Sequence, residues 1–220
     1  MTAADSKIFA IGDIHGCFSK LRDLLARLPY TAGRDRLVFL GDYLNRGPDS
    51  AKVLELLCAR KKTDPGLTTL MGNHEYLLLE YHRTGDEALL PYLRAMGIEA
   101  TLASYEPGNA FNLRDLNFLP AEHLHFLQNL LPYWETDRYI FVHAGLEPDL
   151  PLAANDPSTL CETRNTFIDS NHDFGRKVIF GHTPFELPLV TPTKICIDTG
   201  AVYGNLLTAI ELPGENFYHA

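Results

Sequence analysis

Short apolar segments alternate with amphipathic segments along most of the chain. Leucines spaced three or four residues apart predict helices over 17–28 and 49–60, and a further helix is expected from about 74 to 82. Runs rich in branched aliphatic and aromatic residues predict strands at 7–13, 36–42, 67–72, 138–145, 177–183, 194–199 and 206–212. Because these runs are almost wholly apolar, they indicate sheets that are covered on both faces. The alternation predicts an α/β fold.

The stretch from about 84 to 132 is typical of helices joined by loops. It forms either a cap over a site or one wall of the domain, and the sequence leaves both alternatives open. The chain shows no internal repeat, low-complexity tract or linker-like segment. We therefore interpret residues 1–220 as a single domain, long enough to bury a sizeable core.

Charge and composition narrow the classes of function. A net charge of -9 argues against tight binding to the phosphates of a nucleic acid, which needs clustered lysine and arginine. No apolar run approaches the roughly 20 residues that span a bilayer, and residues 1–7 lack the basic and apolar parts of a signal peptide. The four scattered cysteines suggest neither a disulfide framework nor a zinc knuckle. We expect a cytoplasmic protein without a membrane partner.

Several predicted strands run directly into small loops that combine glycine with a metal-type ligand. Functional groups of α/β proteins gather at the carboxyl ends of strands, and glycine permits close approach of a ligand. Each motif alone also fits an ordinary role, such as a helix cap for Asp13 or a turn for Asn73. Their shared design predicts one site instead. The loops are GDIHG (12–16), GD (41–42), GNHE (72–75), HAG (143–145) and GHT (181–183).

These motifs, in this order, resemble the phosphoprotein phosphatase branch of the calcineurin-like metallophosphoesterases, in its compact bacterial and phage form. The resemblance extends from Asp13 to His182, and the closing segment 197–212 is also similar to the terminal strands of bacterial members. It implies a four-layer α/β sandwich in which two mostly mixed β-sheets are flanked by helices. The matching segments are GDIHG (12–16), GDYLNRG (41–47), GNHE (72–75), HAG (143–145) and GHTP (181–184).

The resemblance also implies a role for each residue of the site. Arg46 and Arg164 would hold the phosphoryl oxygens, Asn73 would contact the substrate as well as a metal, and His74 would protonate the departing oxygen. Six residues are implied as ligands of two divalent metal ions: Asp13 and His15 for the first, Asp42 as the bridge, and Asn73, His143 and His182 for the second.

General chemistry supports this allocation. Two divalent cations neutralise a phosphoester dianion and lower the pKa of a shared water towards 7, so we expect direct attack by hydroxide without a covalent enzyme intermediate. Mixed oxygen and nitrogen ligands suit Mn, Fe or Zn better than Ca or Mg, and we expect Mn. The planar fork of arginine binds phosphate oxygens in pairs.

One residue departs from the family pattern. The protein phosphatases normally carry an aspartate immediately before the arginine of the second motif, whereas this chain carries Asn45. A carboxylate would favour the charged form of His74, and an amide offers no charge. Alkoxide leaving groups need a proton most, tyrosine phenolate (pKa ~10) needs it less, and a phosphate (second pKa ~6) needs it least.

Three hypotheses follow from the residues and the resemblance. The leading one is a protein phosphatase-like phosphomonoesterase that favours aryl over alkyl phosphates, acting on a phosphorylated protein or a small phosphoester. The second is a symmetrical dinucleoside-polyphosphate hydrolase acting on diadenosine tetraphosphate, since that sister group also has a non-acidic residue at the position of Asn45. The third is a metal-bound binding module that has lost turnover. The sequence does not predict an oligomeric state.

Overall fold

Two five-stranded sheets form the centre of the molecule in the computed structural model, which describes residues 6–105 and 111–220. The first sheet has the order β10-β9-β1-β2-β3, with β1 at Ile8–Ile11, β2 at Arg36–Phe39, β3 at Leu67–Thr69, β9 at Thr208–Leu212 and β10 at Asn216–His219. The second has the order β4-β5-β6-β8-β7, with β4 at Tyr133–Glu135, β5 at Tyr139–Val142, β6 at Lys177–Phe180, β7 at Leu189–Val190 and β8 at Lys194–Cys196. In the first sheet β1, β2 and β3 run parallel, and β9 pairs antiparallel with β1 and β10. In the second sheet β5, β6 and β8 run parallel, and the edge strands β4 and β7 are antiparallel.

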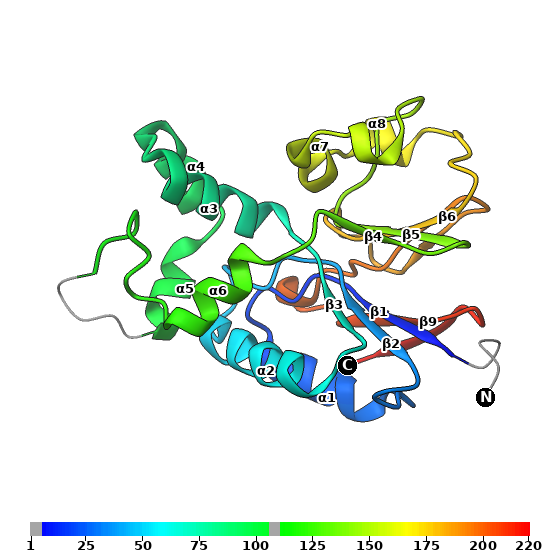
Figure 1. Cartoon of the computed structure of the whole chain (residues 1–220), viewed down its shortest axis with the longest axis horizontal. Helices are drawn as coiled ribbons and strands as arrows, with labels where there is room; N and C mark the ends of the chain where they lie inside the picture. The colour runs from blue at the N-terminus through cyan, green and yellow to red at the C-terminus, as the bar shows by residue number, and fades with distance from the viewer. Residues whose placement is uncertain (1–5, 106–110) are drawn as a thin grey trace.

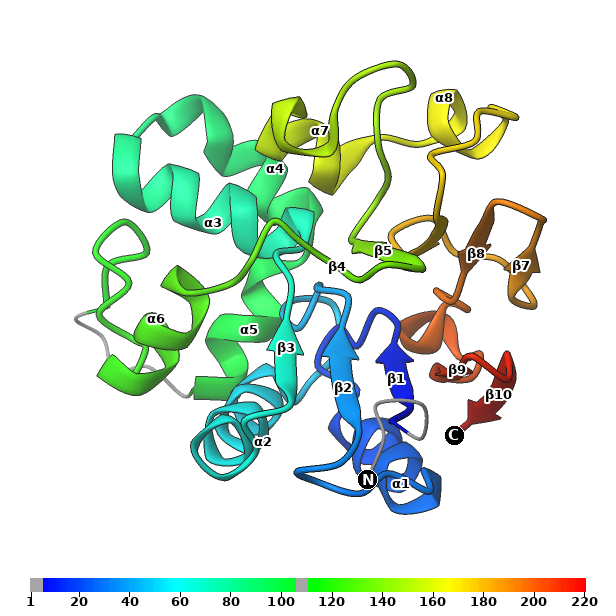
Figure 2. The same cartoon turned by 45° about the vertical axis from the view of Figure 1, so that its right-hand side comes forward.

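Helices cover the outer face of each sheet. α1 (Phe18–Arg27) and α2 (Ser50–Thr63) lie along the first sheet, and α7 (Pro157–Glu162) and α8 (Asn165–Ile168) lie over the second (Figure 1). The two sheets face each other between these helices, which confirms the predicted four-layer α/β sandwich. A further group gathers at one end of the sandwich (Figure 2): α3 (Asn73–Thr84), η2 (Glu87–Leu89), α4 (Leu90–Ala95), α5 (Ile98–Tyr105) and α6 (Ala121–Gln128).

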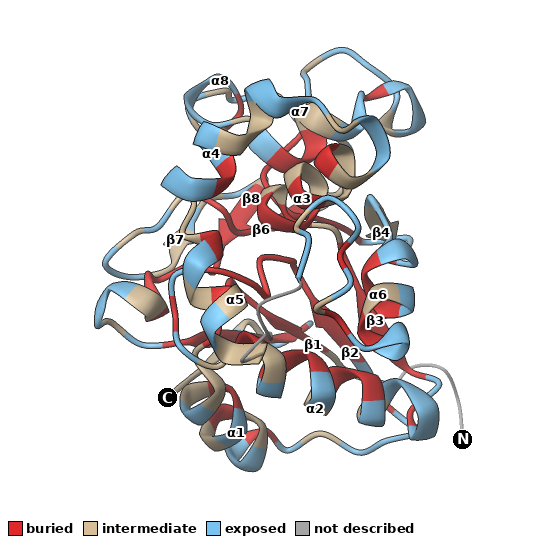
Figure 3. Cartoon of the chain, turned by 90° about the vertical axis from the view of Figure 1, so that its left-hand side faces the viewer, coloured by how far each residue is buried: buried red, intermediate tan, exposed pale blue. Residues whose placement is uncertain are grey.

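Alternating side chains along each strand build the layers, because successive residues of a strand point to opposite faces. In β1, Phe9 packs in the cluster under α1 and α2, whereas Ala10 packs between the sheets. In β5, Phe141 packs between the sheets, whereas Ile140 and Val142 pack in the cluster with α7 and α8. Both faces of the strands are therefore buried, which explains the wholly apolar runs in the sequence (Figure 3).

The predicted elements differ from the structure mainly at their ends. Predicted strands 7–13 and 36–42 contain β1 and β2 but end in loops, because Gly12 and Gly41 begin the turns that carry the site. The described part of 84–132 contains short helices joined by loops, and 106–110 lie outside the described residues. Sequence analysis missed the short edge strands β4, β7 and β10 and the short helices α7 and α8. The assignment of residues 1–220 to one domain stays a prediction.

Within the described ranges, no helix combines the length and the apolar character needed to cross a membrane.

Candidate metal centre and active site

The five predicted loops converge at the same edge of the two sheets. His15 Nε2, from the loop after β1, lies 3.3 Å from Asp42 Oδ2, which follows β2. His143 Nε2, after β5, lies 3.5 Å from Asp42 Oδ1. Asn73 Oδ1, at the start of α3, lies 3.2 Å from His143 Nε2 and 3.1 Å from His182 Nδ1. Residues far apart in the chain therefore form one cluster of nitrogen and oxygen atoms.

Two groups in this cluster have the spacing of metal ligands. His15, Asp42 and His74 form one triad, and Asp42, His143 and His182 form the other, with the ligand atoms of each triad within 4.8 Å of one another. Asp42 belongs to both triads, as a bridging carboxylate requires. All five residues are buried.

Asp13 lies beside these triads and not within them. Both of its carboxylate oxygens accept from the His182 backbone N–H, at 3.2 and 3.1 Å. The first triad contains His74 and not Asp13, and the assignment of Asp13 as a ligand of the first metal stays a prediction. Asp13 and His182 nevertheless meet, as the predicted site requires.

The histidines of the cluster are in the neutral form that can bind a cation. His15 and His143 each place Nδ1 2.9 Å from a backbone carbonyl oxygen, so Nδ1 carries the hydrogen and Nε2 keeps a free electron pair facing Asp42. Burial lowers the pKa of His15 to about 3 and that of His143 to about 4, so both rings are neutral at pH 7. Neutral imidazole is the form that binds metals.

The buried carboxylates of the cluster need positive charge nearby in order to be ionised. Burial raises the pKa of Asp42 to about 7, and burial together with Asp198 and Asp42 raises the pKa of Asp13. Burial and Asp42 also raise the pKa of Glu75, whereas the backbone N–H groups that its carboxylate accepts lower it. Several buried carboxylates that repel one another, among neutral nitrogen ligands, are a donor set that suits divalent transition metals.

Unusual backbone angles aim the ligands into the cluster. Positive φ angles are uncommon outside glycine, and they gather at functional sites. Five residues of the site have them: His15 (φ 45°), Asp42 (φ 53°), Asn45 (φ 68°), Arg46 (φ 67°) and His182 (φ 67°). Gly181 leaves room for a ligand, because a Cβ there would lie 2.1 Å from Asp13 Oδ1.

Glu75 organises the loop that carries Asp42, a role that sequence analysis missed. Its carboxylate accepts hydrogen bonds from the backbone N–H groups of Asp42 (3.0 Å), Tyr43 (2.9 Å), Leu44 (3.1 Å) and Gly72 (3.2 Å). In the sequence, Glu75 was only the last residue of the GNHE motif and part of the helix expected from about 74 to 82. The available signal was its position three residues after Gly72, where an acid of a capping box stands.

The other predicted residues surround the cluster. Asn45 Nδ2 lies 2.9 Å from His74 Nδ1. Arg46 Nη1 lies 3.2 Å from His15 Nε2, and its guanidinium stacks on the ring of Tyr203 at 5.4 Å. Arg164, at the start of α8, places Nη1 3.4 Å from Thr183 Oγ1, in the loop of His182. Both arginines therefore lie in segments that border the cluster.

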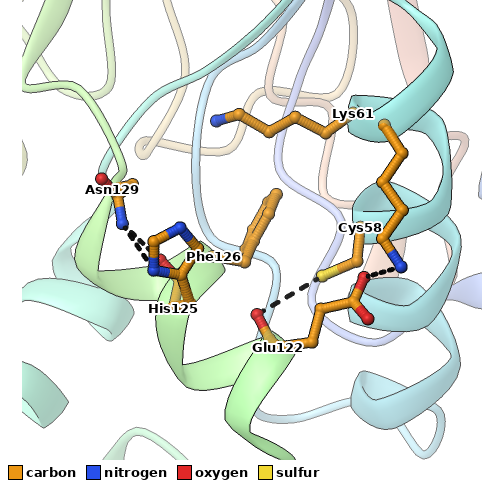
Figure 4. A pocket seen from close by; sticks show the side chains of 7 residues that line it. Cys58, Lys61, Glu122, His125, Phe126 and Asn129 are labelled. Atoms are coloured by element: carbon orange, nitrogen blue, oxygen red, sulfur yellow. Dashed lines mark hydrogen bonds and ion pairs between the residues drawn. The ribbon is translucent and has the colours of Figure 1, made fainter.

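A separate pocket lies between α2 and α6. It has a volume of about 220 Å³ and is lined by Cys58, Lys61, Lys62, Glu122, His125, Phe126 and Asn129 (Figure 4). Its charges pair with one another, since Lys62 Nζ lies 2.8 Å from Glu122 Oε1. None of the metal-type ligands lines it, so we place the candidate active site at the strand tips.

Comparisons with known proteins agree with this geometry. The family model described as calcineurin-like phosphoesterase matches residues 6–203. The bis(5'-nucleosyl)-tetraphosphatase PrpE (asymmetrical) of Oceanobacillus iheyensis is 29% identical over 234 residues, covering 96% of this chain and 90% of the relative.

Two solved structures show the same fold. One is titled a putative diadenosine tetraphosphatase, with a TM-score of 0.72 and 23% identity, covering 100% of this chain and 95% of the other. The second is a protein serine/threonine phosphatase from Saccharomyces cerevisiae, with a TM-score of 0.66 and 17% identity, covering 96% and 74%. With a family model that spans most of its length and a cluster of metal-type ligands at the strand tips, the chain belongs to the calcineurin-like phosphoesterases, a family of metal-dependent hydrolases of phosphoesters.

Proposed function

We propose that this chain hydrolyses dinucleoside tetraphosphates by cleaving a phosphoanhydride bond. The observation that carries the proposal is the pairing of His74 with the uncharged amide of Asn45 at 2.9 Å. Burial, with His15 and Arg46 nearby, lowers the pKa of His74, and no carboxylate in the place of Asn45 counteracts this. A site of this kind suits a leaving group that departs without a proton.

A nucleotide phosphate is such a leaving group, because its second pKa is ~6. The relatives named bis(5'-nucleosyl)-tetraphosphatase PrpE support this substrate class, since the similarity extends over nearly the whole of both chains. Their names specify asymmetrical cleavage, which gives a nucleoside monophosphate and a nucleoside triphosphate. We propose asymmetrical cleavage here, in place of the symmetrical cleavage considered from the sequence.

Two divalent metal ions, when bound, would neutralise phosphate charge and activate a water molecule. The residues that would hold them are those of the cluster: Asp13, His15, Asp42, Asn73, His143 and His182. The donor set suits Mn, Fe and Zn, and we propose Mn as the first metal to test.

The remaining residues would act on the substrate. Arg46 and Arg164 would bind oxygens of the phosphate chain through their paired N–H groups. Asn73 would contact the substrate beside its metal. His74 would donate a hydrogen bond to the departing oxygen or to the phosphoryl group.

A phosphomonoesterase of the protein phosphatase type is the second candidate, because the same pairing of Asn45 with His74 also tolerates a tyrosine phenolate, with a pKa of ~10. The alkoxides released from phosphoserine and phosphothreonine fit this site least. An aryl phosphate and a phosphotyrosine peptide therefore belong in the same substrate panel.

A substrate panel tests the proposal. The metal-depleted protein is assayed with added Mn, Fe or Zn on diadenosine tetraphosphate, a phosphotyrosine peptide and a phosphoserine peptide, with Asp42→Asn as the inactive control. We expect AMP and ATP from the dinucleotide, at a higher kcat/KM than either peptide gives. Two molecules of ADP would refute asymmetrical cleavage. A phosphoserine peptide as the best substrate would refute the argument from Asn45.

A further inference from the structure

A buried cluster of two hydroxyls and an amide lies behind His74. Asn45, Ser50 and Thr101 each have a relative exposure of 0% and come from three different segments, the loop after β2, the start of α2 and the middle of α5. Thr101 Oγ1 lies 2.7 Å from Asn45 Oδ1 and 3.1 Å from Ser50 Oγ. The Asn45 backbone N–H donates to Thr101 Oγ1 at 2.8 Å.

These contacts orient the side-chain amide of Asn45. The Asn45 backbone N–H occupies one lone pair of the Thr101 hydroxyl, and the hydroxyl hydrogen is free to be donated. The shorter of its two contacts leads to Asn45 Oδ1, so the amide oxygen faces Thr101. The amide nitrogen Nδ2 then faces His74 Nδ1, at 2.9 Å.

This orientation fixes the hydrogen of the His74 ring. An amide nitrogen only donates hydrogen bonds, so His74 Nδ1 must accept, and in the neutral ring the hydrogen then lies on Nε2. His15 and His143 have the opposite tautomer, because their Nδ1 atoms donate to backbone carbonyl oxygens at 2.9 Å. His74 Nε2 lies 3.9 Å from Asp42 Oδ2, within the first candidate metal triad. A nitrogen that carries a hydrogen has no electron pair for a metal.

We propose that Thr101 is a positioning residue which acts through Asn45 to keep the hydrogen of His74 on Nε2. His74 is thereby excluded from metal coordination and presents a fixed N–H donor to the oxygen of the substrate that gains charge. A neutral donor stabilises that charge without losing its proton. The consequence for turnover rests on the proposed function, whereas the tautomer does not.

The position of α5 supports this assignment. Asn45 and Arg46 both have left-handed backbone angles, with φ of 68° and 67°. Arg46 N–H donates to the carbonyl oxygen of Gly97, at 3.4 Å, immediately before α5. Thr101 of α5 contacts Asn45, and Gly97, directly before the helix, contacts Arg46, so the 84–132 stretch contributes contacts to the site.

The tautomer can be measured directly by long-range ¹H–¹⁵N NMR on the full-length protein, both metal-free and loaded with diamagnetic Zn²⁺. In the wild-type protein we expect His74 Nδ1 to lack a hydrogen and Nε2 to carry one. Thr101→Val removes the hydroxyl and frees the amide to turn, so a form with a hydrogen on Nδ1 should appear. Thr101→Ser retains the hydroxyl and should retain the wild-type tautomer.

Kinetics on p-nitrophenyl phosphate give the second readout. Loss of one well-placed hydrogen bond in a general acid–base site lowers rates by roughly tenfold or more, so kcat of Thr101→Val should fall by about tenfold with KM little changed. Ser104→Ala is the matched control on the same helix: Ser104 Oγ donates to the backbone carbonyl of Thr101 at 2.7 Å and accepts from the Ala51 N–H at 3.1 Å, so the substitution removes a hydroxyl that supports α5 and leaves the Thr101 hydroxyl in place. It should leave both the tautomer and kcat unchanged.

A wild-type His74 with the hydrogen on Nδ1 would overturn the proposal. So would a Thr101→Val protein that loses activity but keeps the wild-type tautomer, because Thr101 would then act on the fold alone. If Thr101→Val does not fold, Asn45→Asp replaces it: a carboxylate only accepts, so Nδ1 must gain a hydrogen, and an unchanged ring would also overturn the proposal. Failure of the wild-type protein to cleave diadenosine tetraphosphate would refute the proposed function and leave the tautomer result intact.

Discussion

Replacing Asp42 by asparagine should stabilise the metal-free protein at pH 8, although it removes the bridging ligand. Burial raises the pKa of Asp42 from 3.8 to about 7 in the folded chain. A raised pKa means that the folded state favours the protonated acid. The stability associated with this group is therefore fully present below pH 3.8 and is lost as the pH rises through about 7.

The magnitude follows from the same shift. Each pKa unit corresponds to about 1.4 kcal/mol, so the folded metal-free protein is destabilised by on the order of a few kcal/mol at pH 8 and by less at pH 5. The substituted asparagine would carry no charge, and its carbonyl oxygen can still accept the His74 backbone N–H that Asp42 Oδ1 accepts at 3.2 Å. The free energy of unfolding of Asp42→Asn, relative to wild type, should therefore increase with pH.

Urea unfolding of both proteins at pH 5, 6, 7 and 8, after removal of metals with a chelator, measures this difference. Removing the charge of Asp42 also lowers the raised pKa values of Asp13 and Glu75, which adds to the stabilisation of Asp42→Asn at high pH. Adding Mn²⁺ should reverse the order, because only the wild-type protein can bridge two cations. Asp35→Asn is a control for which the opposite change in the free energy of unfolding is expected. Hydrogen bonds from Arg34 lower the pKa of Asp35, so the substitution should destabilise the protein. A difference between Asp42→Asn and wild type that does not change with pH would refute the reasoning.

Three further predictions test the framework around the site. Glu75→Gln should lower kcat at least tenfold, because a neutral amide cannot accept four backbone N–H groups as a carboxylate does; residual structure is checked by circular dichroism. Lys194→Met should lower the Tm and raise KM, because Lys194 Nζ lies 2.5–3.2 Å from three backbone carbonyl oxygens at and just after the end of α8, the helix that Arg164 directly precedes. An unchanged KM would show that this anchoring of α8 does not affect substrate binding. Gly181→Ala should weaken Mn²⁺ binding, measured by calorimetry, because its Cβ would lie 2.1 Å from Asp13 Oδ1.

The central strands and the ligands could be predicted from sequence because both depend on local patterns. β1, β2, β5 and β6 are buried on both faces, so each is a continuous apolar run. The parallel pairing of β1 with β2 and of β5 with β6 brings their carboxyl ends to one edge of each sheet. Glycine and a polar ligand at the end of each run were therefore enough to predict convergence.

The edge strands and the supporting residues could not be predicted, because they depend on contacts between distant segments. β7 has only two residues, and β10 contains Asn216 and His219, so neither has an apolar run. Thr101 lies 56 positions from Asn45 in the sequence, and nothing in its neighbourhood on α5 indicates an amide partner. No spacing in the sequence identifies the hydroxyl and carboxylate groups that orient a ligand residue.

The location of the hydrophobic clusters explains how the chain tolerates its charged site. The cluster between the sheets joins residues of β1, β2, β5, β6 and β9, and it lies along the bodies of the strands while the ligands lie at their tips. Burial of apolar side chains there does not depend on metal, so the repulsion among Asp13, Asp42 and Asp198 acts against a fold that is already stabilised elsewhere. Metal removal should therefore loosen the tips while the sandwich stays folded. That is why the effect of Asp42 can be measured as a pH-dependent difference in unfolding free energy between two folded proteins.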